Sequence, residues 1–220
     1  MLISYTLPCS RRVDDLLRCV PYVVEAANVS PPVEIVVVDY ANDQPLEPLL
    51  PKHFKVPVYR GREHYHMAHA RNIGIRQATG DVIVISSADL IPEPNFFEQI
   101  RAEFNTGATW LTPPARRLRG VIAVLRDELL KAGGFDERFE FYGPEDKEME
   151  ARLRRRLGAP TIYTPAMAKI KTSKERKFQN YSLSTRQEIH DWGKALLKTC
   201  NKEKAMVANE GTEWGSTRQP

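Results

Sequence analysis

The acidic residue Asp89 comes shortly after a predicted buried strand, in the stretch GDVIVISSADLIPEPNFFEQI at residues 80–100. Residues Val82–Ile85 form a continuous apolar, β-branched run, which is typical of a strand covered on both faces. Two prolines then interrupt the chain before Asn95, a predicted N-cap for a helix that begins at Phe96. Asp89 is therefore expected at the carboxyl end of a central strand, the edge where ligands bind in open α/β sheets.

A second group of acids, Glu145 and Asp146, opens the segment GPEDKEMEARLRRRLG, which predicts a helix. Gly143 is expected at its cap and Pro144 at its first helical position, with basic residues 154–156 in its last turn. Acids in the first turn and bases in the last suit the helix macrodipole, which explains the pattern without catalysis. The same carboxylates are also candidates for acid–base chemistry, and both interpretations stay open.

Three histidines, His64, His66 and His69, lie close together in the segment HYHMAH. Three histidines this close together could bind zinc, but neither a cysteine pair nor an HExxH motif accompanies them. The favoured interpretation is that these histidines lie on the surface of a loop and a helix. A histidine within reach of a bound diphosphate is the alternative.

Two stretches of the chain are rich in lysine and arginine. One contains Arg116, Arg117 and Arg119, and the other covers residues 169–177 in KIKTSKERK. Either stretch could follow the phosphates of a nucleic acid, and the second could neutralise a diphosphate. A solvated basic loop is the other interpretation.

The composition limits the fold and the cellular setting. With 220 residues, 42% hydrophobic and 27% charged, the chain can hold one sizeable core. A net charge of +4 suits an anionic ligand without requiring one. Three widely spaced cysteines without a CxxC pair favour a reduced, cytoplasmic setting. No apolar run approaches the roughly 18 residues of a membrane span, and the N-terminus does not resemble a signal peptide.

Strand and helix patterns alternate along the first half of the chain, which predicts βαβ units and a mostly parallel sheet of the α/β class. Gly80 is expected to end the helix in HMAHARNIGIRQATG with a left-handed conformation. After about residue 105 the pattern predicts a smaller mixed region. We expect a single domain over residues 1–202 and a loose tail over 203–220, where the periodicity is lost.

Four segments in this order resemble the GT-A-fold glycosyltransferases, especially inverting family 2 and the related β-1,4-galactosyltransferase and polypeptide GalNAc-transferase groups. The segments are ISYTLPCSRR, EIVVVDYAND, AHARNIGIRQATGDVIVISSAD and GVIAVLRDELLKAGGFDERFEFYGPEDKEMEARLRRRLG. The resemblance covers about residues 2–160. It implies a Rossmann-like GT-A fold with a donor-binding half at about 1–105 and an acceptor or catalytic half at about 106–202.

The resemblance also implies which residues bind the nucleotide-sugar donor. Thr6 and Asp39 match positions that hold the base and ribose, and a carboxylate there accepts the ring N–H of uracil. Tyr40 replaces a second acid of the family and could stack on the base. Arg71 and Asn72 match a segment beside the donor phosphates, where a guanidinium forms charge-assisted bonds. The alternatives are a turn-forming role for Asp39 and a solvated helix face for Arg71.

In the family that the chain resembles, an Asp-x-Asp turn holds Mn²⁺ or Mg²⁺, which stabilises the leaving diphosphate. Here the turn is Ser87-Ala88-Asp89, so the resemblance implies Asp89 as the metal ligand and Ser87 as a ribose contact. The segment TIYTPAMAKIKTSKERKF lacks the histidine that many relatives use as a further ligand. Lys171 and Lys174 of this segment could neutralise the donor diphosphate in place of a metal ion. Because Ser87 supplies no charge, the divalent cation is expected to bind weakly on its own.

Asp146 matches the general base of the family, and Glu145 matches a contact to acceptor hydroxyls. The implied function is inverting, hexosyltransferase-type transfer from a nucleotide-diphosphate sugar, above all a UDP-sugar, to a hydroxyl of a glycan or small molecule. Two alternatives remain. One is a nucleotide-binding pseudoenzyme, which Ser87 and Tyr40 favour, and the other is a glycosyltransferase with a nucleic-acid acceptor.

Overall fold

The computed structural model describes residues 1–62, 64–114, 118, 120–141, 143–170 and 186–218. The strands are β1 (Ile3–Cys9), β2 (Val33–Tyr40), β3 (Val58–Tyr59), β4 (Val82–Ile85), β5 (Leu90–Pro92), β6 (Trp110–Thr112), β7 (Ile122–Leu125), β8 (Thr161–Ile162) and β9 (Met167–Lys169). The helices are α1 (Val13–Val29), α2 (Met67–Gln77), α3 (Phe96–Asn105), α4 (Arg126–Lys131), α5 (Glu145–Leu157) and α7 (Arg186–Glu203), with a 3₁₀ turn η1 at Glu47–Leu49. Within the described ranges, none of these helices combines the length and apolar composition that a bilayer span requires.

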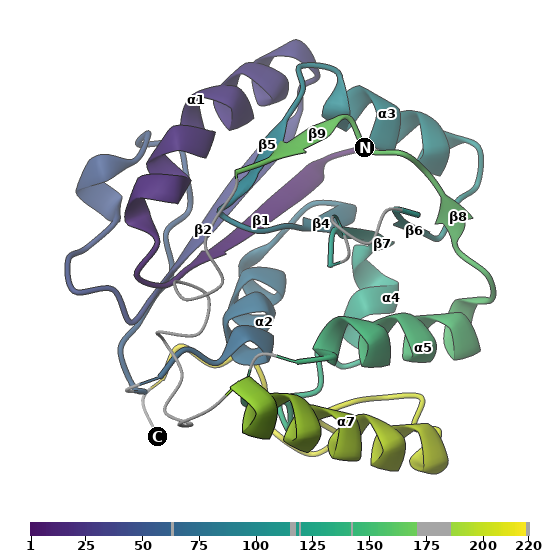
Figure 1. Ribbon diagram of the computed structural model, residues 1–220. Coiled ribbons are helices and arrows are strands. Elements are labelled where there is room, and N and C mark those ends of the chain that lie inside the picture. The colour runs from purple at the N-terminus through teal and green to yellow at the C-terminus, as the bar shows by residue number, and fades with distance from the viewer. Residues whose placement is uncertain (63, 115–117, 119, 142, 171–185, 219–220) are drawn as a thin grey trace.

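Seven of the strands form one sheet in the order β3-β2-β1-β4-β7-β6-β8 (Figure 1). The first four strands of this order are parallel, β7 runs antiparallel to β4 and β6, and β8 is parallel to β6. Strands β5 and β9 form a separate antiparallel pair. The predicted α/β class, with a mostly parallel sheet and a smaller mixed region, is confirmed.

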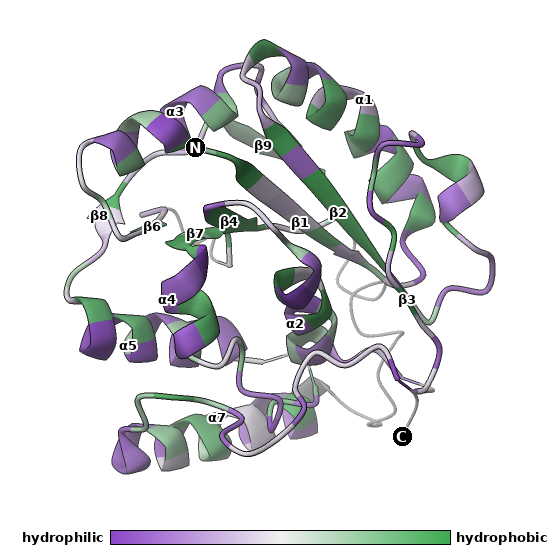
Figure 2. Ribbon diagram, turned by 180° about the vertical axis from the view of Figure 1, so that it is seen from behind, coloured by the Kyte–Doolittle hydropathy of each residue, from purple (hydrophilic) through white to green (hydrophobic). Residues whose placement is uncertain are grey.

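Helices cover both faces of the sheet, and the alternation along β1 shows which side each residue faces. Ile3, Tyr5 and Leu7 belong to a core shared with α1 and α3, whereas α2, α4 and α5 build the core on the other face. In Figure 2 the strands are coloured mainly as hydrophobic, while the helices alternate between hydrophilic and hydrophobic residues. Gly74 of α2 lies directly above Thr6, because a Cβ at Gly74 would be 3.2 Å from the Cβ of Thr6.

Gly80 does not end α2 in a left-handed conformation, so that prediction was wrong. The helix ends at Gln77, its C-cap Ala78 is extended, and Gly80 is not among the glycines with positive φ. Instead, a Cβ on Gly80 would lie 2.8 Å from the carbonyl oxygen of Leu2 and 2.7 Å from Oγ of Ser4. The glycine is required because the turn into β4 passes so close to β1, a contact that local sequence patterns do not reveal.

Two predicted helix caps also differ in detail. Asn95 precedes α3 as predicted, but its side chain makes no capping hydrogen bond. Pro144, rather than Gly143, is the N-cap residue of α5, which begins at Glu145. The predicted positions of both helices are otherwise correct, because hydrophobic periodicity marks a helix better than its ends.

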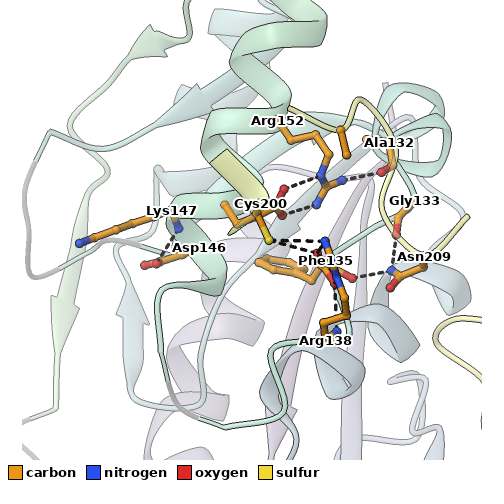
Figure 3. A network of polar contacts seen from close by, with 12 residues as sticks. Ala132, Gly133, Phe135, Arg138, Asp146, Lys147, Arg152, Cys200 and Asn209 are labelled. Atoms are coloured by element: carbon orange, nitrogen blue, oxygen red, sulfur yellow. Dashed lines mark hydrogen bonds and ion pairs between the residues drawn. The ribbon is translucent and has the colours of Figure 1, made fainter. Parts of the chain in front are cut away.

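The segment after α7 is docked on the body of the protein, which differs from the loose tail that the sequence predicted. Nδ2 of Asn209 donates to the carbonyl oxygens of Gly133 (2.8 Å) and Phe135 (2.6 Å), as Figure 3 shows. Its Oδ1 accepts from the backbone N–H of Glu137 at 2.9 Å. These partners lie more than 70 residues away in sequence, so the loss of periodicity carried no information about them. The predicted domain limits stay a prediction.

We expect Asn209→Ala to lower the free energy of unfolding by about 2 kcal/mol, because it removes three hydrogen bonds and leaves backbone groups unpaired. Urea denaturation followed by tryptophan fluorescence measures this change. Asn201→Ala, at an exposed position of α7, is the matched control. Equal effects of the two substitutions would show that Asn209 does not hold the tail.

Candidate active site

The parallel strands β1, β2 and β4 end at one edge of the sheet. Cys9, the last residue of β1, is paired in register with Asp39 near the end of β2. β4 ends at Ile85, which is paired with Thr6 of β1. The turn that follows β4 carries Asp89, so the structure places this acid beyond the carboxyl end of a central strand.

Asp89 is 2% exposed, and both of its carboxylate oxygens have partners. Oγ of Ser87 donates to Oδ1 at 2.7 Å, and Oδ2 lies 3.2 Å from Nη2 of Arg12 and 3.8 Å from Nζ of Lys169. Burial acts to raise the pKa of Asp89, but Lys169, Arg12 and Ser87 outweigh it, so the pKa lies below its usual value. Asp89 is therefore an ionised carboxylate between two cations.

Lys169 reaches Asp89 because two short strands are paired beside it. In the β5–β9 ladder, Lys169 lies opposite Leu90, the residue after Asp89. The backbone N–H of Ile170 also donates to the carbonyl oxygen of Asp89 at 2.8 Å. The β5–β9 pairing thus fixes the backbone position of Lys169 beside Asp89.

The acids at the start of α5 lie beside Arg71 of α2. Nη1 of Arg71 is 3.1 Å from Oε1 of Glu145, whose Oε2 accepts from the N–H of Gly143 at 3.2 Å. A Cβ on Gly120 would lie 3.0 Å from Nη2 of Arg71 and 3.9 Å from Oδ2 of Asp146, so this guanidinium and this carboxylate line the same small space. Burial, partly opposed by Arg71 and reinforced by Asp146, raises the pKa of Glu145.

Asp39 is completely buried and is bound by three donors from the protein itself. Its Oδ1 accepts from Nδ2 of Asn42 at 2.7 Å, and its Oδ2 accepts from the N–H of Leu46 at 3.0 Å and from Nη2 of Arg60 at 2.8 Å. Arg60 also donates to the carbonyl oxygen of Asp39 at 2.9 Å. Asp39 therefore organises the turn after β2, as its alternative interpretation predicted, and its role in donor binding stays a prediction.

The family model of glycosyl transferase family 2 matches residues 4–158 of the sequence. The chain belongs to glycosyl transferase family 2. The resemblance of its four segments to GT-A glycosyltransferases is confirmed, and the protein is a glycosyltransferase. Comparison with curated proteins finds no significant sequence match.

Solved structures with this fold include several glycosyltransferases. The catalytic domain of Drosophila β1,4-galactosyltransferase 7, in complex with xylobiose, has a TM-score of 0.60 at 17% identity and covers 85% of this chain and 77% of that one. Glucosyl-3-phosphoglycerate synthase from Mycobacterium tuberculosis, in complex with Mn²⁺, UDP and phosphoglyceric acid, has a TM-score of 0.63 at 15% identity, covering 96% and 80%. These likenesses show the GT-A fold.

The residues around Asp89 in this family 2 domain do not fit a divalent cation. Across the part of the chain that the structure describes, no group of three or more histidine, cysteine or acidic side chains could hold a metal ion. Asp89 is the lone acid of its turn, and Arg12 and Lys169 already lie against its Oδ2. A dication at Asp89 would lie close to both of these cations and would be repelled by them. Hard cations gain affinity from additional charged oxygen ligands, and Asp89 is the lone acid of this turn.

Three residues predicted to bind the donor are fully buried: Thr6, Tyr40 and Asn72. Thr6 lies in the middle of β1, and its hydroxyl donates to the carbonyl oxygen of Val84 at 3.3 Å. Tyr40 is hydrogen-bonded through its hydroxyl to Nδ1 of His69 at 3.1 Å. The amide of Asn72 donates to the carbonyl oxygen of Phe135 at 2.9 Å and accepts from its N–H at 2.7 Å. Their contacts are structural, and their roles toward a donor stay predictions.

Several basic residues named from the sequence lie outside the described residues. They are Arg116, Arg117, Arg119, Lys171 and Lys174. Their predicted contacts to phosphates stay predictions.

The clustered histidines belong mainly to the core rather than to the loop and helix surface that the sequence favoured. His66 is the N-cap of α2, where its Nδ1 accepts from the N–H of His69 at 3.1 Å and its Nε2 lies 3.0 Å from the carbonyl oxygen of Glu137. Nε2 of His69 lies 3.0 Å from the carbonyl oxygen of Ser216 in the docked tail. His64 stacks on Phe141 at a centroid distance of 5.6 Å. Burial and the nearby Arg62 lower the pKa of His66 to about 3.

Two arginines of the site were not singled out from the sequence. Arg12 stands in the β1–α1 turn, and Arg60 directly follows β3. Each lies just beyond the carboxyl end of a parallel strand, and this position is a signal that could have identified them.

We expect His66→Asn to reduce the acid sensitivity of the protein. An unfolded histidine has a pKa of about 6.5, so between that pH and about 3 the unfolded chain binds a proton that the folded chain excludes. Stability therefore falls as pH decreases through this window, by about 2 kcal/mol at pH 5 from this residue. Asparagine keeps an acceptor at the N-cap without titrating. Unfolding curves at pH 7.5 and 5 test this, with exposed His53→Asn as the control; identical pH sensitivity in wild type and His66→Asn would contradict it.

Asp39→Ala is expected to lower the free energy of unfolding by about 3 kcal/mol, because it leaves the Arg60 guanidinium and the N–H of Leu46 without their buried acceptor. Chemical denaturation measures the loss, and Asp43→Ala, at an exposed position of the same turn, is the control. If both variants are as stable as the wild type, the pairing of Asp39 is not structural.

Proposed function

We propose that this family 2 enzyme transfers a sugar from a UDP-sugar to an acceptor hydroxyl with inversion at the anomeric carbon. The observation that carries the proposal is the position of Asp146 at the start of α5. This carboxylate is half-buried beside Arg71, whereas Asp39, Asp89 and Glu145 are almost completely buried. Asp146 is thus the acid of this group that an acceptor can approach.

The contacts of Asp146 support its assignment as the general base. Its Oδ1 accepts from the N–H of Lys147 at 2.8 Å (Figure 3), and no described residue donates to its Oδ2. One oxygen therefore fixes the orientation of the carboxylate, and the other has a lone pair for an incoming hydroxyl. Positioning of this kind contributes much of the rate, so a carboxylate can serve as the base.

The reaction is an in-line displacement at the anomeric carbon. Asp146 takes the proton of the acceptor hydroxyl, and the oxygen forms a bond to the anomeric carbon. The bond from that carbon to the diphosphate oxygen breaks on the opposite face, and the nucleoside diphosphate leaves with the electron pair. Configuration is inverted because attack and departure occur on opposite faces.

Glu145 and Arg71 hold the start of helix α5, which carries the proposed base. Both oxygens of Glu145 are used within the protein, by Arg71 and by the N–H of Gly143. The guanidinium of Arg71 also lies 4.8 Å from the ring centroid of Phe135. These contacts favour a positioning role for Glu145 at the helix start, and direct contact with acceptor hydroxyls stays a prediction.

The donor is expected at the carboxyl edge of β1, β2 and β4. The resemblance implies that Asp39, which is paired with Arg60, holds the base, and that Ser87 and Asp89 face the ribose and the phosphates. The synthase from M. tuberculosis was solved with UDP, and a mannosyltransferase from Pyrobaculum calidifontis, with a TM-score of 0.58 at 19% identity over 74% of this chain and 54% of that one, was solved with GDP-mannose. Uracil is our first choice because the family resemblance implies it and the synthase of similar fold was solved with UDP.

The acceptor is expected to be a glycan or small-molecule hydroxyl. A cytoplasmic location also stays a prediction, and the three free, buried cysteines are compatible with it.

Asp146→Asn is expected to lower sugar transfer by about 10²-fold or more while UDP affinity stays within about twofold, because the amide cannot take the acceptor proton. The assay measures hydrolysis of UDP-glucose and UDP-galactose, with water as acceptor, alongside calorimetric titration of UDP. Asp127→Asn, on the exposed surface of α4, is the control.

Near-normal turnover in Asp146→Asn would end the assignment of this base. Binding of UDP by the wild type without hydrolysis or transfer of any tested sugar would instead favour the pseudoenzyme.

A further inference from the structure

We propose that Arg12 and Lys169, held in place by Asp89, bind the donor diphosphate directly, so that this glycosyltransferase does not require a divalent cation. The inference rests on the proposed function, because it names the group that neutralises the leaving diphosphate. It assigns Asp89 a positioning role instead of a ligand role.

Both carboxylate oxygens of Asp89 have partners within the protein. Oδ1 accepts from Ser87, and Oδ2 faces both Arg12 and Lys169. The side chain is 2% exposed. A metal ion would have to displace these partners and then find its remaining ligands elsewhere, whereas the present arrangement satisfies the carboxylate.

Arg12 is held between two carboxylates. Its Nε and Nη2 donate to Oδ2 of Asp15 at 3.0 and 2.8 Å, and Nη2 lies 3.2 Å from Asp89. Asp15 belongs to the first turn of α1, so the guanidinium is fixed between two elements of the fold. A fixed guanidinium loses little conformational entropy when a phosphate binds.

Lys169 is the more exposed of the two cations beside Asp89. Its side chain is 33% exposed, and its Nζ lies 3.8 Å from Asp89, beyond hydrogen-bond distance. The β5–β9 ladder fixes its backbone opposite Leu90. A phosphate oxygen can therefore approach this partly exposed ammonium, which lies within the field of Asp89.

Charge decides between a dication and a diphosphate at this place. Asp15, Asp89, Arg12 and Lys169 together carry two negative and two positive charges. A dication near Asp89 would be repelled by Arg12 and Lys169 at short range, whereas both cations attract the negative charge of a diphosphate. A lysine and an arginine are also common phosphate contacts.

The test is calorimetric titration of UDP into the intact protein, once with EDTA and once with Mn²⁺. We expect the two affinities to agree within about twofold. Lys169→Gln should weaken UDP binding by about tenfold or more in both conditions, since a charge-assisted contact is lost. Lys194→Gln, at an exposed position of α7, should bind like the wild type, and Lys169→Arg should retain most of the affinity. Thermal unfolding confirms that each variant is folded.

Binding of UDP in Mn²⁺ but not in EDTA would overturn this inference and leave the proposed transferase intact. A folded Lys169→Gln that binds UDP as well as the wild type would also overturn it. The EDTA comparison uses only the wild type, so it decides the question even if a variant does not fold. Failure of UDP, GDP and other nucleoside diphosphates to bind in either condition would contradict the proposed function itself.

Discussion

A carboxylate buried at the edge of a sheet costs free energy unless a cation or several hydrogen-bond donors lie beside it. The candidate site depends on this constraint at three places, and at each of them an arginine from a different segment supplies the charge. The pairs are Asp89 with Arg12, Asp39 with Arg60, and Glu145 with Arg71. Removing one partner would leave an isolated buried charge, so each pair also joins the segments that carry it.

Helix α2 connects the two halves of the site through two consecutive residues. Arg71 reaches Glu145 at the start of α5, and Asn72 exchanges hydrogen bonds with the backbone of Phe135. Glu137, two residues further on, accepts from Asn72 at 2.8 Å and from the N–H of Gly215 in the docked tail at 2.8 Å. The proposed base Asp146 therefore lies on a helix start that is braced from α2, and its orientation does not depend on a loop alone.

The inner face of α5 is held by a buried ion pair as well as by apolar packing. Arg152 is completely buried, makes two hydrogen bonds to Glu148 one turn earlier, and donates to the carbonyl oxygen of Ala132 (Figure 3). Met149 and Leu153 face the core. Arg152 is tolerated at this inward position because Glu148 and the carbonyl oxygen of Ala132 satisfy its guanidinium.

The sequence by itself determined the elements of the fold and the edge of the sheet at which a ligand would bind. The run before Asp89 predicts a buried strand, and the acids and bases of α5 predict a helix, because both signals depend on residues near each other in the chain. The four segments also predicted the family. Only the tertiary structure decided which partners these residues have. The need for glycine at Gly80, the cap at His66, the docking of Asn209 and the cations on Asp89 all arise from contacts between distant segments. Local periodicity cannot encode such contacts, since it reports which face of an element is apolar and not what that face meets.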